Sequence, residues 1–197
     1  LYGIYFAKNS ISKKNNCFLV EGYTDVISLH QKGVENVVSA SGTSLTIEQI
    51  KLINRFTQNI TILFDGDNAG IKASFRGVDM ILKEGMNVKV VPFPDNEDPD
   101  SFAQKSSEEE LSHFLDAEAI DFITYKTNIL NAESEKDPIK RVAIIKDIIR
   151  SIALIPDYLT RTEYCKVCSK LLDVKENVLL RDIDQERKKI NLSQNIK

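Results

Sequence analysis

Short apolar runs alternate with amphipathic stretches along the first 117 residues of the chain. Stretches with apolar residues every three or four positions predict helices, and runs rich in Val, Ile, Leu and Phe predict strands at residues 17–21, 34–41, 59–67 and 87–94. Strands separated by helices of about 10 to 15 residues form βαβ units, whose crossovers place helices on the faces of a parallel sheet. The pattern therefore predicts an α/β sandwich around a parallel sheet.

Two of the predicted helices begin with the spacing of a capping box. Thr46 precedes Gln49 by three positions, and Ser106 precedes Glu109 by three. Residues 95–104, just before the second of these helices, are rich in acidic residues and predict a loop.

Beyond residue 117 the pattern is helical throughout. Four apolar residues recur at helical spacing between Val142 and Ile152, and Pro156 ends that segment. Two further amphipathic segments follow before residue 188. We therefore expect a small all-α bundle over residues 118–188, followed by a flexible tail at residues 189–197, where apolar residues are few.

Composition and charge narrow the class of protein. Of the 197 residues 42% are hydrophobic and 28% charged, which is typical of a soluble globular protein. The apolar runs are far shorter than the roughly 18 to 20 residues that span a membrane, so no membrane association is expected. A net charge of −3 argues against broad, nonspecific affinity for nucleic acid and leaves open a local basic strip.

The three cysteines, Cys17, Cys165 and Cys168, are too few for a disulfide framework, which favours a cytosolic protein. Cys165 and Cys168 form a C-x-x-C, but a second such pair is missing, and His30 and His113 are distant in sequence. Because a structural zinc site takes four ligands, zinc is not expected. The helical pattern around the pair predicts small buried side chains instead.

Acidic residues follow three of the four predicted strands. Glu21 ends the first strand, Asp65 and Asp67 end the third, and residues 95–100 follow the fourth; the loop 41–43 follows the second. In an open parallel sheet, ligands bind outside the carboxyl ends of the strands. We therefore expect these acids to meet at one edge of the sheet.

The pair in FDGD sharpens this expectation. Asp65 and Asp67 are two positions apart, so in extended chain their side chains point the same way, and Gly66 lets another group approach the backbone. Two carboxylates about 4 Å apart repel by roughly 4 kcal/mol at an effective dielectric constant of about 20. A cation must offset this repulsion, and carboxylates without Cys or His suit Mg²⁺ or Mn²⁺.

Each of these features has a simpler interpretation when it is taken alone. The D-G-D can be a turn with Asp67 capping the next helix, and residues 95–100 can be a solvated loop. Asp25, one helical turn after Glu21, can be an acid that favours the helix dipole, and residues 41–45 can merely join a strand to a helix. Acids at three strand ends together favour a metal site over these alternatives.

Four strings occur in order along the chain: FLVEGYTDVISLHQKG, SASGTSLTIEQI, ILFDGDNAGIKAS and PDNEDPDSF. Together they resemble the toprim domain of bacterial DnaG-type DNA primases, although Ser41 stands where Leu is common in that family. A Glu after the first strand and a D-x-D after the third are shared with topoisomerases, some nucleases and recombination mediators. The longer strings are those of primases, and the helical half resembles the bundle that ends the primase catalytic core.

The resemblance implies a division of the chain and a set of site residues. Residues 1–15 would be a linker from a missing N-terminal subdomain, residues 16–117 the toprim domain, and the rest the bundle and tail described above. Catalytic roles would fall to Glu21, Asp65 and Asp67. Two or more Mg²⁺ or Mn²⁺ ions would be held by the acids Glu21, Asp25, Asp65, Asp67, Asp98 and Asp100. The pocket would be shaped by Gly22, Gly42, Thr43, Gly66 and Gly70.

The implied activity is metal-dependent nucleotidyl transfer, which makes short RNA primers on a single-stranded DNA template during replication. The implied partners are the DNA template, NTPs, the RNA–DNA hybrid and, through a region outside this chain, the replicative helicase; the protein would be a monomer in the bacterial cytoplasm. The segment alone would be weak or inactive, because the basic subdomain of the family is absent. Two alternatives stay open: another toprim enzyme, such as a nuclease or topoisomerase, and a toprim binding module without catalysis.

Overall fold

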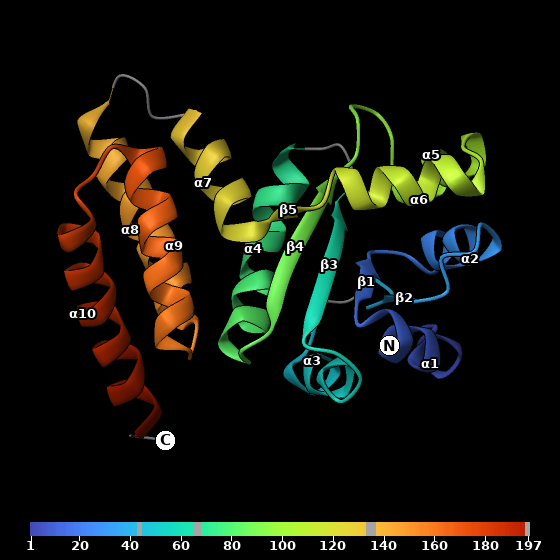
Figure 1. Cartoon of the computed structure of the whole chain (residues 1–197), viewed down its shortest axis with the longest axis horizontal. Coiled ribbons are helices and arrows are strands. Elements are labelled where there is room, and N and C mark those ends of the chain that lie inside the picture. Colours follow the sequence, from blue (N-terminus) through green and yellow to red (C-terminus); the bar gives the residue numbers. More distant parts are fainter. Residues whose placement is uncertain (43–44, 65–67, 133–136, 196–197) are drawn as a thin grey trace. The chain divides into compact units, whose positions relative to one another are not determined.

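The computed structural model describes most of the chain, namely residues 1–42, 45–64, 68–132 and 137–195. These residues form ten helices and a five-stranded sheet (Figure 1). Contacts divide the chain into two compact units, Leu1–Ile120 and Asp121–Lys197. The division falls close to the predicted boundary after residue 117.

The first unit is built on the sheet, whose strands follow the order β2-β1-β3-β4-β5. The strands are β1 (Cys17–Val20), β2 (Val37–Ser39), β3 (Asn59–Phe64), β4 (Asn87–Pro92) and β5 (Ile120–Asp121). The pairs β1–β2, β1–β3 and β3–β4 are parallel, with Leu19 opposite Val38 and Ile62. Every residue of β1 is buried, as expected of a strand with neighbours on both sides and helices on both faces. The predicted α/β fold with a parallel sheet is confirmed.

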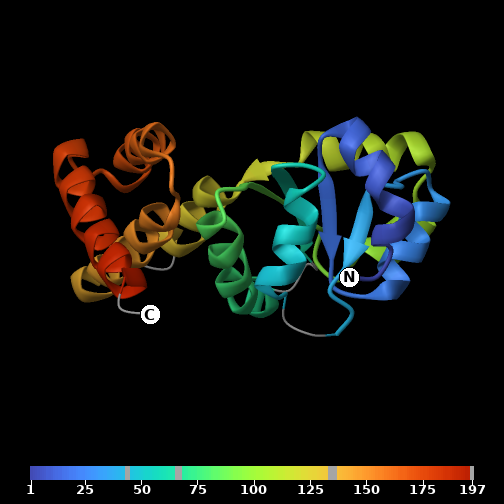
Figure 2. The ribbon, with the colours of Figure 1, turned by 90° about the horizontal axis from the view of Figure 1, so that it is seen from below.

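Helices cover both faces of this sheet. They are α1 (Ile4–Lys14), α2 (Tyr23–Gln31), α3 (Ile47–Asn54), α4 (Asn68–Lys83), α5 (Pro99–Lys105) and α6 (Glu108–Ala117). Figures 1 and 2 show α3 and α4 on one face and α2, α5 and α6 on the other. On the second face Phe18 and Val91 of the strands pack with Leu29 of α2 and Leu111 of α6. This packing holds α2 beside α5, the two helices that carry predicted acids.

Two segments for which the sequence predicted no helix contain one. Residues 1–15, predicted as a linker, contain α1, which buries Ala7 and Ile11 within the first unit. The predicted loop at residues 95–104 contains the start of α5, which has Asp98 as its N-cap and Pro99 in its first turn. The loop prediction was wrong because an N-cap and a first-turn proline start a helix even when the surrounding residues are acidic.

One predicted capping box is displaced by a single residue. Thr46 caps α3 together with Gln49, as predicted. The next box pairs Ser107 with Glu110, whereas Ser106, the predicted cap, is the C-cap of α5. The repeated Ser and Glu of SSEEE allow two frames, and the end of α5 at Lys105 selects the second.

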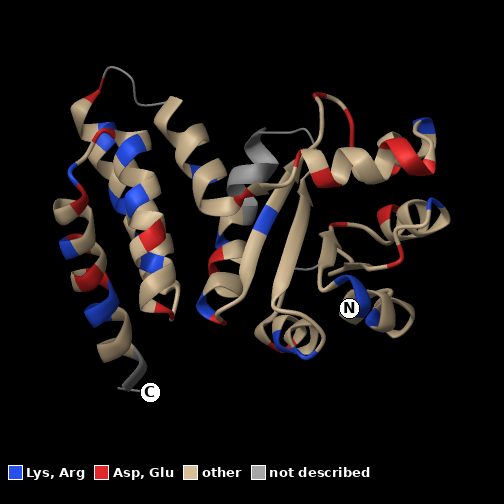
Figure 3. Ribbon diagram, in the orientation of Figure 1, with Lys and Arg blue, Asp and Glu red and all other residues tan. Residues whose placement is uncertain are grey.

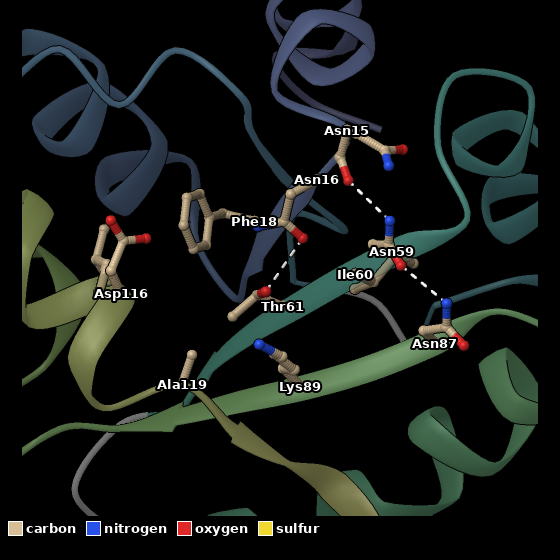
Figure 4. A pocket seen from close by; sticks show the side chains of 11 residues that line it. Asn15, Asn16, Phe18, Asn59, Ile60, Thr61, Asn87, Lys89, Asp116 and Ala119 are labelled. Atoms are coloured by element: carbon tan, nitrogen blue, oxygen red, sulfur yellow. Dashed lines mark hydrogen bonds between the residues drawn. The ribbon is translucent and has the colours of Figure 1, made fainter.

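Asparagine side chains tie together the amino ends of the strands (Figure 4). Asn87 Nδ2 donates to Asn59 Oδ1 at 2.9 Å, and Asn59 Nδ2 donates to the carbonyl of Asn15 at 2.9 Å. Thr61 Oγ1 donates to Asn16 Oδ1 at 3.1 Å. These residues line a cavity of about 290 Å³. The cavity lies at the amino ends of the strands, whereas the predicted acids follow their carboxyl ends.

The second unit is a bundle of four helices in the described residues, as predicted. They are α7 (Phe122–Ala132), α8 (Pro138–Leu154), α9 (Tyr158–Leu172) and α10 (Glu176–Asn195). Cys165 and Cys168 are fully buried on α9, which confirms their predicted place inside a helix. The predicted flexible tail begins within α10, which continues to Asn195. No helix of the described residues has the length and hydrophobicity needed to cross a membrane.

One lysine is buried inside this bundle. Lys126 of α7 is only 1% exposed, and its Nζ lies 2.8 Å from Asp147 Oδ2 and donates to Ser151 Oγ at 2.9 Å. Both partners lie on α8, so the charged group is held between two helices. A buried ammonium group without such partners would strongly destabilise the fold.

Candidate functional site

The junction between β1 and α2 carries the first two predicted acids. β1 ends at Val20, the exposed Glu21 follows directly, and Gly22 is the N-cap of α2. Asp25, in the first turn of α2, is only 8% exposed. The Gly22 N–H donates to Asp25 Oδ2 at 2.9 Å, which turns the carboxylate back toward the end of β1. Asp25 therefore does cap the helix, and its other oxygen accepts no hydrogen bond from the described residues.

Gly22 is needed at this junction because of space. A Cβ built on Gly22 would lie 3.2 Å from Asp25 Oδ2 and 3.3 Å from Thr24 Oγ1, closer than nearly all real Cβ contacts. The backbone of Gly22 is extended, so a side chain would be allowed by conformation alone. Its predicted role in shaping the pocket therefore has a steric basis at Asp25.

The start of α5 brings two more predicted acids to the same part of the molecule. Figure 3 shows acidic residues along the loop from β4 to α5. Asp98 caps α5 by accepting from the Ser101 N–H at 2.7 Å. Asp100 accepts a short hydrogen bond from Ser28 Oγ of α2, and Gln104 Nε2 donates to the same oxygen at 2.8 Å. Residues 72 positions apart thus meet where α2 packs against α5.

We call Glu21, Asp25, Asp98 and Asp100 the acidic edge. Burial raises the pKa of Asp25 above its ordinary value; the Gly22 N–H lowers this pKa, and the charges of Asp98, Asp100 and Glu21 raise it again. The charges of Asp98, Asp100 and Glu21 thus act on the Asp25 carboxyl group. Carboxylate oxygens with uncompensated negative charge are the donors that Mg²⁺ and Mn²⁺ prefer, so the acidic edge fits such ions by its chemistry.

The loop after β2 approaches the same end of the sheet. Gly42 has φ +73°, a left-handed conformation that other residues adopt only with strain, and Ser41 before it has φ 55°. Gly42 and Glu21 line one cavity of about 850 Å³, together with Arg76 of α4. The remaining walls of this cavity are mostly apolar side chains of the strands and α4. The predicted role of Gly42 as a pocket residue is therefore consistent with its position beside Glu21.

Several predicted site residues cannot be placed in this geometry. Thr43, Asp65, Gly66 and Asp67 lie outside the described residues. Gly70 is described and lies in the first turn of α4. Within the ranges that the structure describes, no group of three His, Cys, Asp or Glu side chains is arranged to hold a metal ion. The roles of the D-G-D acids therefore remain predictions from the sequence.

Sequence reasoning missed two polar partners of the acidic edge, Ser28 and Gln104. Gln104 follows Asp100 by four positions, a spacing at which Gln and Asp side chains form hydrogen bonds on a helix. This contact could therefore have been predicted if α5 had been recognised as a helix. Ser28 offers no such local signal, because its partner belongs to a distant segment.

Comparisons with known proteins find similar sequences among toprim-like domains and DNA primases. A family model described as Toprim-like matches residues 18–103. The DNA primase of Clostridium acetobutylicum is 35% identical over 184 residues, which cover 91% of this chain and 30% of that protein.

Two solved structures are similar in fold over most of the chain. A DNA primase domain from Pseudomonas aeruginosa matches with a TM-score of 0.80 at 27% identity, over 95% of this chain and 59% of that one. The DnaG primase catalytic domain bound to ssDNA matches with a TM-score of 0.74 at 27% identity, over 86% and 56%. The chain thus spans about 30% of the length of the curated primase that it resembles.

Proposed function

Since this chain belongs to the bacterial DnaG-type primases, as a segment of their catalytic core, we propose that it forms the acidic half of a primer-synthesising active site. The whole enzyme would join ribonucleotides on a single-stranded DNA template during replication. The observation that carries this proposal is the acidic edge. Its carboxylates come from the β1–α2 junction and from α5, and the charges of the other three raise the pKa of Asp25.

The proposed reaction is nucleotidyl transfer. The 3′-hydroxyl oxygen of a ribonucleotide forms a bond to the α-phosphorus of an incoming NTP, the bond from that phosphorus to the leaving oxygen breaks, and pyrophosphate departs. Glu21 is exposed beside the 850 Å³ cavity and accepts the proton of the attacking hydroxyl or serves as a ligand. Asp25 and Asp100 each keep one carboxylate oxygen without a protein donor among the described residues.

Divalent ions are part of this proposal. Mg²⁺ or Mn²⁺, two or more ions, would be held by Glu21, Asp25, Asp98 and Asp100 together with the D-G-D acids Asp65 and Asp67. When bound, such ions neutralise the charge that develops on the transferred phosphoryl group and on the leaving pyrophosphate. The protein's own part is to hold its carboxylates in place before the ions arrive.

The partners follow from the same proposal. A related DnaG catalytic domain has been solved bound to ssDNA, which supports a single-stranded template as the partner here. NTPs and the RNA–DNA hybrid would be bound by the whole enzyme, with divalent ions at the acidic edge neutralising their phosphates, and the replicative helicase would contact a region outside this chain. Such a replication enzyme acts as a monomer in the bacterial cytoplasm. The segment alone is expected to be weak or inactive as a primase, because carboxylates hold cations but repel the phosphates of the template and the NTPs.

Primer synthesis by a complete primase that contains this segment tests the proposal. Asp65→Asn and Asp100→Asn should each lower template-dependent synthesis by at least about 100-fold, because each removes a ligand charge from the site. Asp116→Asn is the matched control, since Asp116 is exposed and lines the cavity at the opposite edge of the sheet. Full synthesis by both Asp65→Asn and Asp100→Asn would refute the proposal.

The same assay separates the alternatives. A toprim nuclease or topoisomerase would cut or relax DNA in the presence of Mg²⁺ and would make no primers. A binding module would show neither chemistry nor uptake of Mn²⁺ that depends on the acids. Each of these results would replace primer synthesis as the function.

A further inference from the structure

Asp100 is held by two donors that bond to the same oxygen. Ser28 Oγ, from the middle of α2, donates to Asp100 Oδ1 in a short hydrogen bond, and Gln104 Nε2, one turn further along α5, donates to Oδ1 at 2.8 Å. No described residue donates to Oδ2. The carboxylate is therefore fixed through one oxygen while the other is left for a ligand.

Asp25 is also held through only one of its carboxylate oxygens. Its Oδ2 accepts the Gly22 N–H at 2.9 Å, and its Oδ1 accepts no bond from the described residues. Asp25 precedes Ser28 by three positions, so the two side chains lie on one face of α2. The face of α2 that carries one acid thus also carries the hydroxyl that orients the other.

We propose that Ser28 and Gln104 are positioning residues that hold Asp100 Oδ1, so that Asp100 Oδ2 faces the same divalent ion as Asp25. This inference rests on the proposed function and deepens it by naming residues outside the acidic edge that set its affinity for metal. Partners that orient a metal-binding carboxylate typically change metal affinity by about 10- to 100-fold when they are removed. Neither residue was among the predicted site residues, although Ser28 lies within the string FLVEGYTDVISLHQKG.

A purely structural role for Ser28 is the competing explanation. The Ser28–Asp100 bond joins α2 to α5, so it can serve only to fix the two helices together. That role predicts a loss of stability without a specific loss of metal affinity. Gln104 separates the two explanations further, since it is exposed and bonds within its own helix, so its removal leaves the α2–α5 contact in place.

Titration of the 197-residue chain with Mn²⁺ in a calorimeter provides the test. Ser28→Ala and Gln104→Ala should each raise the Mn²⁺ dissociation constant by about 10-fold, and Ser28→Thr, which keeps the hydroxyl, should restore most of the affinity. The midpoint of thermal unfolding without metal should move by no more than about 4 °C. Gln31→Ala and Ser112→Ala, which remove exposed side chains that make no hydrogen bond to another described residue, should leave the affinity unchanged.

Two reference variants keep this inference distinct from the proposed function. If Asp100→Asn and Glu21→Gln weaken Mn²⁺ binding but Ser28→Ala and Gln104→Ala do not, the positioning role is refuted and the metal site stands. If none of the four variants changes Mn²⁺ binding, the metal site itself is refuted. If Ser28→Ala lowers stability and neither Ser28→Ala nor Gln104→Ala changes the Mn²⁺ affinity, Ser28 has the structural role alone and the positioning role is refuted.

Discussion

Gly22→Ala tests whether the space around Asp25 controls metal binding. The added Cβ would lie 3.2 Å from Asp25 Oδ2 and 3.3 Å from Thr24 Oγ1, so the carboxylate must move by a few tenths of an ångström. That movement lengthens the 2.9 Å bond from the residue 22 N–H to Oδ2. The backbone itself can stay, because φ −103° and ψ 160° are allowed for alanine.

The two expected effects of Gly22→Ala differ in size. Alanine is a poorer N-cap than glycine, but it also lowers the entropy of the unfolded chain, so stability should change by less than about 1 kcal/mol. A hydrogen bond to a charged group contributes about 1.5 to 3 kcal/mol. Weakening the bond to Asp25 Oδ2 by about half therefore lowers the free energy that holds the carboxylate in its place for metal binding by roughly 1 kcal/mol. This corresponds to roughly fivefold weaker Mn²⁺ binding.

Calorimetric titration with Mn²⁺ and urea unfolding without metal measure the two effects separately. Gly77→Ala is the control, because a Cβ on Gly77 meets nothing within 4 Å. Within α4 it should stabilise the protein by up to about 1 kcal/mol and leave Mn²⁺ binding unchanged. Unchanged Mn²⁺ affinity in Gly22→Ala would show that the contact with Asp25 does not control the site.

Four further outcomes are expected. The pKa of Asp25 is raised from 3.8, so ionisation of its carboxyl group destabilises the metal-free fold as the pH rises above that value. In urea melts with EDTA, Asp25→Asn should be as stable as the wild type near pH 3 and more stable than the wild type at pH 7. A difference in stability that does not change with pH would contradict this. Lys126→Met should be neutral or stabilising, whereas Asp147→Asn should cost about 1 to 3 kcal/mol in the same melts, because it leaves the buried Lys126 ammonium group with less compensation; the reverse order would count against a stabilising role of the exposed Asp147 carboxylate. Asn59→Ala should cost about 0.5 to 1.5 kcal/mol, because it breaks two solvent-exposed hydrogen bonds of 2.9 Å at the amino ends of the strands, and an unchanged denaturation midpoint would exclude that role. The three cysteine thiols should react with a thiol reagent at pH 8 only after unfolding, since burial raises their pKa values to about 11 or 12, and rapid labelling of the native protein would disagree.

Local patterns were sufficient for most of the first unit. The strands at β1, β3 and β4 were predicted because buried parallel strands are continuous apolar runs, and α3 because Thr46 and Gln49 form a local capping box. The α5 helix was missed although Asp98 and Pro99 mark its start, because its seven residues are too few for a periodic apolar face. Missing α5 in turn shifted the next capping box by one residue.

The bundle shows where periodicity alone is insufficient. Val142 was predicted to share the apolar face of its helix, yet it is 51% exposed, whereas Ile149 and Ile152 are buried. Spacing identifies residues on one face of a helix but not where a neighbouring helix stops covering that face. The helical pattern therefore predicted α8, and tertiary packing decided which of its residues form the core.

By itself, the sequence determined which acids follow the strands and why they suit a hard divalent cation, because those properties depend on residue type and local order. Only the tertiary structure decided how the acids are held: α2 packs against α5, so that Ser28 reaches Asp100 across 72 positions, and Gly22 leaves just enough room for Asp25. Such contacts depend on the packing of distant segments, and a side chain such as Ser28 carries no local sign of its partner. The chemistry of this site can therefore be read along the chain, but its geometry cannot.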